Sequence, residues 1–386
     1  MTNRIERQFE HQDPIEAGSA LLRSLLILGM SLAPVAAMAD LGGATTIASG
    51  LANPRGIAFA PNGALYVAEA GSGGPGPCNL SPVPGNGLRC YGETGAITRI
   101  LGDGSVKRVL TGLPSMVLLR DGTVEGGVTD VAFFGTTAFV TMGWGGNPAD
   151  RAALGGKSAL FGTLLQMAPS GTYKVLADIA AYEAAFNPGG GNPDSNPYNT
   201  LAQPGRRIVV DPGANALFEV LANGRTRTFA VPPRLPGLPP FMAGREPVPT
   251  SVVEGPDGAL YVGQLTSFPF WQGTSSVLRI SSDGSSIETY ATGFTAVVDL
   301  AFDTGGALYV LEVARGQAMP FPPPNPGLGQ GRLLRVCPGG APEVLLTGLN
   351  FASGLAIGPD DAAYLTNNGA SPTDGEVLRL PLASCP

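Results

Sequence analysis

Histidine is almost missing from this chain of 386 residues, which contains a single one, His11. Imidazole is the side chain that titrates near neutral pH, the base of Ser-His-Asp and Cys-His catalysis, and a frequent metal ligand. His11 lies in an N-terminal segment that we expect to be removed, which leaves a protein without imidazole. That absence excludes a histidine general base, Ser-His-Asp and Cys-His catalytic sites, and metal sites with histidine ligands.

Charged residues are also scarce. Asp, Glu, Lys and Arg make up 14% of the sequence, compared with roughly a quarter of an average domain. The formal net charge is −7 and no basic cluster occurs, so nucleic acid is not a predicted partner. No glycine-rich loop joins a strand to a helix, which argues against a dinucleotide cofactor. Glycine and proline are abundant instead, with 56 and 36 residues.

A short motif recurs along the chain: a Pro or Gly turn, a small residue, an aromatic residue, an aliphatic residue and a polar residue. Four clear copies span 61–69, 256–264, 304–312 and 359–367, and two weaker copies span 134–142 and 204–211. Around each copy, short apolar runs separated by turn residues are typical of four strands. The repeat predicts six units of roughly 40 to 70 residues, and hence an all-β, six-bladed β-propeller.

The two ends of the repeat array complement each other. The last unit ends with its third strand at 376–380 and has no fourth, whereas an unassigned strand at 45–48 precedes the first unit. We expect this N-terminal strand to complete the last blade, because the pairing hides two sheet edges that otherwise favour aggregation. Residues 40–386 are then a single propeller domain.

The first 39 residues resemble a signal peptide. An apolar stretch from Ser24 to Ala37 ends in Ala37-Met38-Ala39, which has the small-residue pattern of a cleavage site. The stretch is too short to span a bilayer. The preceding residues are unusually acidic for a signal peptide, which leaves the start of translation open. We expect a mature protein that begins at Asp40, has no transmembrane segment, and is periplasmic or extracellular.

Four cysteines in the mature part fit an oxidising compartment. Cys78 and Cys90 flank a Gly/Pro-rich loop of the first unit, and Cys337 and Cys385 follow the third strands of the last two units. We expect the disulfides Cys78–Cys90 and Cys337–Cys385. A zinc site is not predicted, because no Cys-x-x-Cys motif is present.

Long insertions fall only in two kinds of connection, from the second to the third strand of a unit and from the fourth strand to the next unit. In an up-and-down blade both kinds emerge on the same face, where binding sites are usually built. These insertions carry the predicted ligand-binding aromatics Trp144, Phe268, Phe270 and Trp271. The alternative is that the same aromatic rings pack the loops onto the propeller.

A polar residue follows the aromatic position of most units by three places, at the end of the second strand. These positions hold Glu69, Met142, Asp211, Gln264, Glu312 and Asn367, and the first strands add Asp130 and Asp299. We expect them to line the channel mouth. Oxygen ligands suit a hard cation, so Glu69, Asp211 and Glu312 are the candidate ligands of a Ca²⁺ ion. The alternative is that each caps its strand by hydrogen bonding to neighbouring backbone.

Several segments together resemble the ScyD/ScyE family of exported bacterial proteins. They are Asn53 to Phe59, Gly63 to Gly71, the loop from Gly76 to Gly92, Gly95 to Ile100 and Asp194 to Tyr198. The likeness covers nearly all of the mature chain. It implies a propeller related to the NHL and SMP-30 groups and, through the family name, a link to scytonemin biosynthesis. The sequence departs from the family pattern at 199–201, and the resemblance implies no catalytic residues.

The favoured function is therefore that of an exported protein that binds a small molecule, a glycan or a partner protein on the face with the long loops, linked to secondary-metabolite or envelope processes. One alternative is a metal-dependent hydrolase like SMP-30 or gluconolactonase, in which carboxylates at the channel mouth hold a divalent cation that activates water. Another is a structural envelope protein. Quinoprotein sugar dehydrogenases and streptogramin lyases are disfavoured because they rely on histidine.

Overall fold

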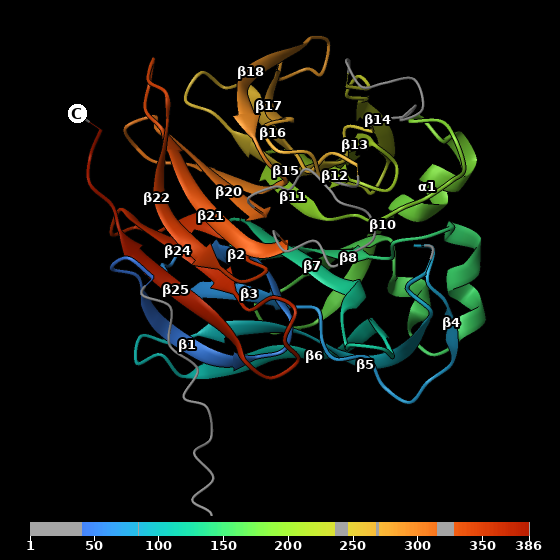
Figure 1. Ribbon diagram of the computed structural model, residues 1–386. Coiled ribbons are helices and arrows are strands. Elements are labelled where there is room, and N and C mark those ends of the chain that lie inside the picture. The colour runs from blue at the N-terminus through green and yellow to red at the C-terminus, as the bar shows by residue number, and fades with distance from the viewer. Residues whose placement is uncertain (1–40, 84, 236–245, 268–269, 315–327, 386) are drawn as a thin grey trace, which may run out of the picture. The chain divides into compact units, whose positions relative to one another are not determined.

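The computed structural model describes residues 41–83, 85–235, 246–267, 270–314 and 328–385 (Figure 1). The described residues belong to a compact unit, Asp40–Pro386, that consists mainly of antiparallel β-strands, and the prediction of an all-β fold is confirmed. None of its helices is long and apolar enough to cross a membrane. The predicted signal peptide, 1–39, lies outside the described residues.

The N-terminal strand pairs with the C-terminal strand, as predicted. This four-stranded sheet consists, in spatial order, of β1 (Thr45–Leu51), β25 (Gly375–Pro381), β24 (Ala362–Asn367) and β23 (Leu355–Ile357). β1 and β25 are antiparallel, with Thr45 opposite Arg379 and Ala48 opposite Val377. Ala48 and Leu51 are buried, whereas Ser49 is exposed. One face of β1 therefore belongs to the core.

Three further sheets have four strands each, in simple up-and-down order. The first contains β11 (Asn199–Gln203), β12 (Arg206–Asp211), β13 (Ala216–Leu221) and β14 (Thr226–Ala230). The second contains β15 (Pro249–Glu254), β16 (Leu260–Gln264), β17 (Ser275–Ile280) and β18 (Ile287–Phe294). The third contains β19 (Val297–Phe302), β20 (Leu308–Ala314), β21 (Leu328–Val336) and β22 (Pro342–Leu349).

Where the sequence predicts two separate blades, the structure has one nine-stranded sheet, in the order β10–β9–β8–β7–β6–β5–β3–β2 with β4 beside β5. Its strands are β2 (Pro54–Phe59), β3 (Leu65–Glu69), β4 (Cys78–Leu80), β5 (Leu88–Ile100), β6 (Val106–Leu118), β7 (Val124–Phe134), β8 (Thr137–Gly143), β9 (Thr163–Met167) and β10 (Tyr173–Asp178). The two predicted units join because β6 extends far enough for Met116 and Val117 to pair with Gly126 and Val124 of β7.

The first strands of successive units lie side by side around a closed ring. β2 contacts β7, β7 contacts β11, β11 contacts β15, β15 contacts β19, β19 contacts β23, and β23 contacts β2. Apolar clusters fill the spaces between neighbouring sheets; Ile208 and Val210 of β12, for example, pack with Leu260 and Val262 of β16. The core is thus divided among the interfaces between sheets, and each sheet is stabilised by both of its neighbours.

Both predicted disulfides are confirmed. Cys78–Cys90 joins β4 to β5, and Cys337–Cys385 joins the end of β21 to the C-terminal segment. Closing loops of 12 and 48 residues restricts the unfolded chain, which corresponds to about 3 and about 4 kcal/mol of stability. The second bridge also holds the end of the chain against the sheet that contains β21.

Candidate functional site

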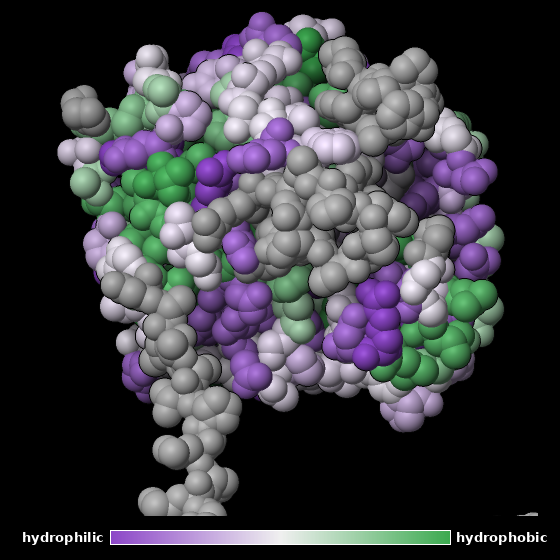
Figure 2. Space-filling model, in the orientation of Figure 1, coloured by the Kyte–Doolittle hydropathy of each residue, from purple (hydrophilic) through white to green (hydrophobic). Residues whose placement is uncertain are grey.

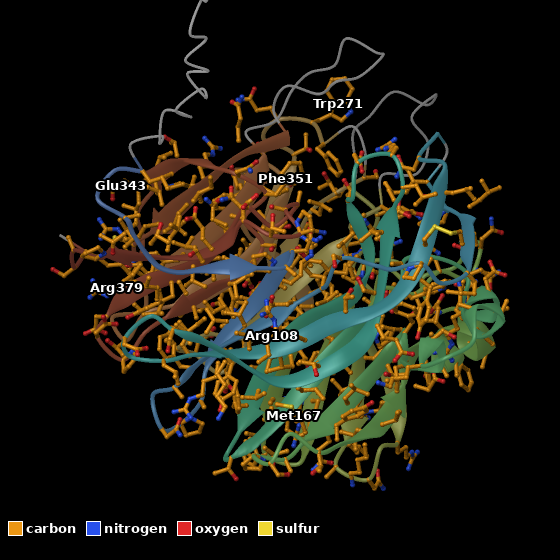
Figure 3. The ribbon with its side chains drawn as sticks, turned by 90° about the horizontal axis from the view of Figure 1, so that it is seen from below. Arg108, Met167, Trp271, Glu343, Phe351 and Arg379 are labelled. Carbon is orange, nitrogen blue, oxygen red and sulfur yellow. A yellow bond between two sulfur atoms is a disulfide. The ribbon has the colours of Figure 1, made fainter. Side chains whose placement is uncertain are left out.

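The two ends of the propeller unit differ in their connections. Figure 3 shows Trp271 at one end and Met167, beside a tight hairpin turn, at the other. The long connections of the Trp271 end carry β4, two 3₁₀-helices, η1 (Pro148–Leu154) and η2 (Ser158–Leu160), and the helix α1 (Ile179–Phe186). We call this end the long-loop face and the Met167 end the tight-turn face.

Glu69, the first predicted metal ligand, is fully buried and bound within its own sheet. Its carboxylate accepts hydrogen bonds from the backbone N–H of Ala52 (2.7 Å) and from the Thr98 hydroxyl. Arg108 of β6 completes the set with an ion pair at 2.8 Å. These partners lie on the segment that enters the sheet and on its third and fourth strands, so Glu69 fastens four parts of one unit together.

Glu312 has the same kind of environment. It accepts a hydrogen bond from the backbone N–H of Thr295 (2.8 Å), in the segment that enters its sheet, and forms an ion pair with Arg332 of β21. Burial raises the pKa of Glu312, and the hydrogen bond from Arg332 opposes that rise. The carboxylate is therefore committed to an internal cation rather than left open for a metal ion.

Asp211 is likewise buried beneath its own loop. It accepts hydrogen bonds from the Ser195 hydroxyl (2.7 Å) and from the backbone N–H groups of Asn196 (2.6 Å) and Ala214 (3.0 Å). Burial is the main cause that raises its pKa to about 7. The structure does not bring Asp211 together with Glu69 and Glu312: no group of three or more Asp, Glu, His or Cys side chains in the described ranges has the arrangement of a metal site.

The two amides of the predicted channel mouth also serve their own sheets. Gln264 accepts a hydrogen bond from the Ser276 hydroxyl, and Asn367 accepts one from the backbone N–H of Asn350 (2.7 Å) while donating to Glu376 (2.8 Å). Asn367, Glu69 and Glu312 thus all receive a backbone N–H of the segment that enters their sheet. The capping interpretation of these repeated polar residues matches the observed hydrogen bonds.

Asp130 and Asp299 link neighbouring first strands around the ring. Asp130 of β7 accepts from the backbone N–H of Thr200 on β11 (2.9 Å), and Asp299 of β19 accepts from Leu355 on β23 (2.7 Å). Gly56 of β2 makes room for Asp130, because a Cβ there would lie 2.0 Å from its Oδ1 atom. Burial raises the pKa of Asp130 to about 7. The pKa of Asp299 is raised well above its usual range, mainly by burial and secondly by the charge of Asp130.

One acidic group on the long-loop face was not predicted from the sequence. Glu183 of α1 is buried, and its Oε2 atom has no hydrogen-bond partner in the described part of the chain. Burial, and then the charges of Asp211 and Asp194, raise its pKa to about 7. No repeat position marks Glu183, because α1 lies in an insertion that interrupts the blade pattern.

The predicted aromatic ligands fall into two groups. Trp144 is completely buried, with the Arg89 guanidinium 4.3 Å from its ring centroid and its indole N–H bonded to the carbonyl of Asn147 (2.8 Å). It therefore packs the loop, which is the alternative that the sequence left open. Trp271 and Phe270 are partly exposed on the long-loop face, and Phe268 lies outside the described residues.

An exposed apolar patch gathers on the disulfide-linked hairpin of the long-loop face. We call it the hairpin patch; it consists of Leu80, Val83, Leu88 and Leu119, which are 46–73% exposed. Leu80 and Leu88 are opposite each other in the β4–β5 register, and Leu119 donates its backbone N–H to the carbonyl of Leu88 (2.9 Å). Figure 2 shows a hydrophobic area at its lower right, where Figure 1 places β4.

No family model and no curated protein matches the sequence. Among solved structures, the chain is similar to a structural genomics protein from Bacteroides thetaiotaomicron (TM-score 0.52, 11% identity, 87% of this chain and 75% of that one). It is also similar to a glucose dehydrogenase (TM-score 0.50, 15% identity, 88% and 99%). A regucalcin from Agrobacterium tumefaciens, described as a calcium-binding protein, has a TM-score of 0.49 at 12% identity, over 89% and 98% of the chains.

The two likenesses with TM-scores of 0.50 and 0.52, together with the closed ring of sheets, decide the fold. The chain is a β-propeller. Identities of 11–15% extend to the fold alone. Membership of the ScyD/ScyE family stays a prediction. The activities of these neighbours belong to sites built on a shared scaffold, and such sites must be argued from their own residues.

Proposed function

We propose that this chain is an exported binding protein that captures a partner through the long-loop face. The hairpin patch carries the proposal. Contiguous exposed apolar side chains on a soluble protein often mark an interaction site, because their contact with water is unfavourable. The Cys78–Cys90 disulfide stiffens the hairpin, which lowers the conformational entropy lost on binding. Export is supported by the two disulfides, which persist in oxidising compartments.

We further propose that the ring has six blades. The closed ring of contacts between six first strands, from β2 to β23 and back, supports this count. On this interpretation the nine-stranded sheet is two blades, β2–β3–β5–β6 and β7–β8–β9–β10, joined by the β6–β7 hairpin, with β4 as an additional strand beside β5. The join fixes the first two blades relative to each other beneath the long loops, and so gives the hairpin patch a rigid support.

The binding role can be tested by selecting peptides from a phage-displayed library on the immobilised protein. We expect the selected peptides to be rich in large apolar residues and to lose at least about tenfold in affinity for the Leu80→Glu/Leu88→Glu variant, since a charge in the patch opposes desolvation. Val344→Glu is the matched control, because Val344 is also an exposed apolar residue, 45% accessible, on β22 outside the patch. Equal binding to all three proteins would contradict the proposal.

The alternative function, a calcium-dependent hydrolase, can be tested by replacing Glu312. In a metal site, replacing one of three repelling carboxylates with Gln stabilises the metal-free protein and weakens a calcium-induced rise in Tm. The ion pair with Arg332 leads us to expect that Glu312→Gln instead destabilises the protein by about 2 kcal/mol. We expect equal Tm values for the parent protein in CaCl₂ and in chelator. A calcium-dependent rise that Glu312→Gln removes would favour the hydrolase.

A further inference from the structure

A polar cluster recurs on the tight-turn face, at the Met167 end, in three units. It combines an Asp in the turn before the second strand, a Tyr on that strand and an Arg on the third strand. In the unit β15–β18, Asp257 Oδ2 accepts hydrogen bonds from Arg279 Nε (2.7 Å) and from the Tyr261 hydroxyl (3.3 Å). In a second unit Asp303 Oδ2 accepts from the Tyr309 hydroxyl (3.1 Å), and Arg335 is opposite Tyr309 in the β20–β21 register. In a third, Asp360 Oδ2 accepts from Arg379 Nε (2.8 Å) and from the Tyr364 hydroxyl (3.1 Å).

The fourth strand supplies a second carboxylate in two of these units. Arg279 is opposite Glu288 in the β17–β18 register and pairs with it at 2.8 Å. Arg335 is opposite Glu343 of β22 and pairs with it at the same distance. Where Asp, Glu and Arg all occur, the formal charges sum to −1, and each guanidinium has an internal carboxylate partner.

The unit β2–β3–β5–β6 keeps the Tyr and the Arg of this cluster but has neither carboxylate. Asn62 occupies the turn position, Tyr66 the second strand and Arg99 the third, and Lys107 stands where two of the other units have Glu. The formal charges of these positions sum to +2. Arg99 and Lys107 face each other across the strands, a pairing of like charges that is unfavourable without an anion between them.

The orientation of Asn62 places a donor where the equivalent cluster has a carboxylate oxygen. Its Oδ1 atom accepts the backbone N–H of Ala64 at 3.1 Å, as Asp257 Oδ1 accepts that of Ala259 at 3.2 Å. The amide nitrogen of Asn62 therefore occupies the position of the second carboxylate oxygen, and it is a donor. In the described part of the chain, the buried Nε of Arg99 has no hydrogen-bond partner. The Nε of Arg335 also lacks one, but Arg335 is paired with Glu343 through Nη2 (2.8 Å), whereas Arg99 faces Lys107.

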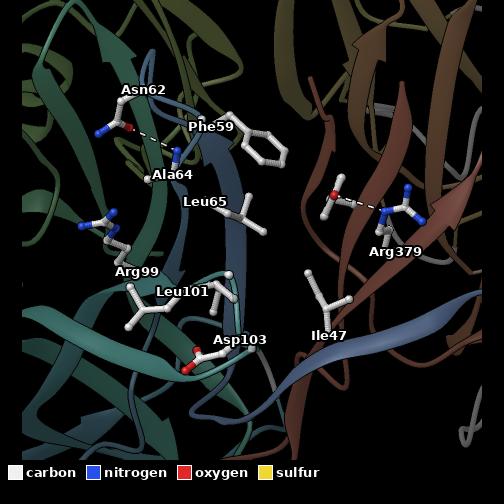
Figure 4. A pocket seen from close by; sticks show the side chains of 14 residues that line it. Ile47, Phe59, Asn62, Ala64, Leu65, Arg99, Leu101, Asp103 and Arg379 are labelled. Atoms are coloured by element: carbon white, nitrogen blue, oxygen red, sulfur yellow. Dashed lines mark hydrogen bonds between the residues drawn. The ribbon is translucent and has the colours of Figure 1, made fainter. Parts of the chain in front are cut away.

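The cluster is open to solvent on both sides of Asn62. A cavity of about 610 Å³ is lined by Asn62, Arg99, Asp103 and Arg379, and a second of about 140 Å³ is lined by Asn62 and Tyr66. Figure 4 shows the Arg99 guanidinium and the Asn62 amide nitrogen directed to the same side, away from Arg379. The other two charged residues are already bound: Asp103 to the hydroxyl of Ser105 (2.6 Å) and Arg379 to Asp360 (2.6 Å).

We propose that Asn62, Tyr66, Arg99 and Lys107 form a binding site for the carboxylate group of a small organic acid or peptide. The ligand oxygen takes the place that Asp257 Oδ2 holds in the equivalent cluster, where it accepts from the Arg and Tyr side chains. The Asn62 amide adds a donor that the internal clusters lack, and Lys107 adds charge. A guanidinium with a free edge suits a planar carboxylate, because it offers two parallel N–H groups.

The test is calorimetric titration of the mature protein with acetate, succinate and inorganic phosphate, each against chloride at constant ionic strength. We expect saturable binding of the carboxylates in the millimolar range. Asn62→Asp supplies an internal carboxylate, so this variant should bind at least about tenfold more weakly and have a higher Tm. Lys107→Glu should weaken binding in the same direction.

Asn223→Asp is the matched control, since Asn223 also lies in an exposed turn and its Oδ1 accepts a backbone N–H, that of Arg225 (3.1 Å). Its binding should stay within about twofold of the parent protein's. This control also separates specific binding from the general stabilisation of folded proteins by phosphate. Equal affinities of the parent and Asn62→Asp proteins, or no saturable binding of either carboxylate, would overturn the proposal. Binding of phosphate alone would overturn the carboxylate assignment.

Discussion

Replacing Ala48 with lysine is expected to lower the free energy of unfolding by about 3 kcal/mol or more and to make the protein associate. Ala48 lies on the buried face of β1, opposite Val377, and packs in the cluster that joins β1 to β2 and β3. A charge at this position cannot be buried without a partner, so β1 should leave β25. The exposed edge of β25 then becomes available to a second copy of the chain.

The control for this prediction lies one residue away. Ser49 is on the exposed face of the same strand and opposite Glu376, so Ser49→Lys adds the same charge where water and a carboxylate receive it. Chemical denaturation and light scattering measure the two expected effects. If Ala48→Lys and Ser49→Lys unfold at the same denaturant concentration and both stay monomeric, pairing of β1 does not hold the ring closed.

The stability of the protein is expected to fall as the pH rises from about 4 to about 7. The pKa values of Asp130, Asp211 and Glu183 are each raised to about 7 by burial, whereas an unfolded carboxyl titrates near 4. Between these values the folded protein holds a proton that the unfolded chain has lost. Each group therefore lowers stability as the pH rises through this range, by at most about 1.4 kcal/mol per pH unit.

Asp130→Asn isolates one of these contributions. The amide oxygen of Asn can still accept the N–H of Thr200, but the side chain does not ionise, so the slope of stability against pH should fall by at most about 1.4 kcal/mol per unit between pH 5 and pH 7. Asp283→Asn is the opposite control: Asp283 is exposed and its hydrogen bonds with Ser281 and Ser285 lower its pKa. The contribution of the Asp283 carboxylate to stability is lost only under acidic conditions. A parent protein whose denaturation midpoint rises from pH 5 to pH 7 would contradict the prediction.

The sequence by itself determined the all-β repeat, the closure by β1 and the two disulfides. Each of these follows from local pattern and counting. Turn residues and alternating apolar residues specify strands wherever they occur, and a last unit with three strands needs a fourth from elsewhere in the chain. Spacing along the chain also sufficed for the cysteines, because each pair lies in segments that the repeat brings together.

Only the tertiary structure decided what the polar residues do. Glu69 and Glu312 occupy repeated positions, but their partners Arg108 and Arg332 come from segments 39 and 20 residues away, and the strand register determines which charges meet. Trp144 is buried because Arg89 stacks on it from another insertion. The lack of a carboxylate partner for Arg99 could be recognised only from the strand register, which shows that Arg99 and Arg279 occupy equivalent positions. The strand pattern repeats within each unit, whereas the charge balance of a cluster depends on residues from three or four separate strands and turns.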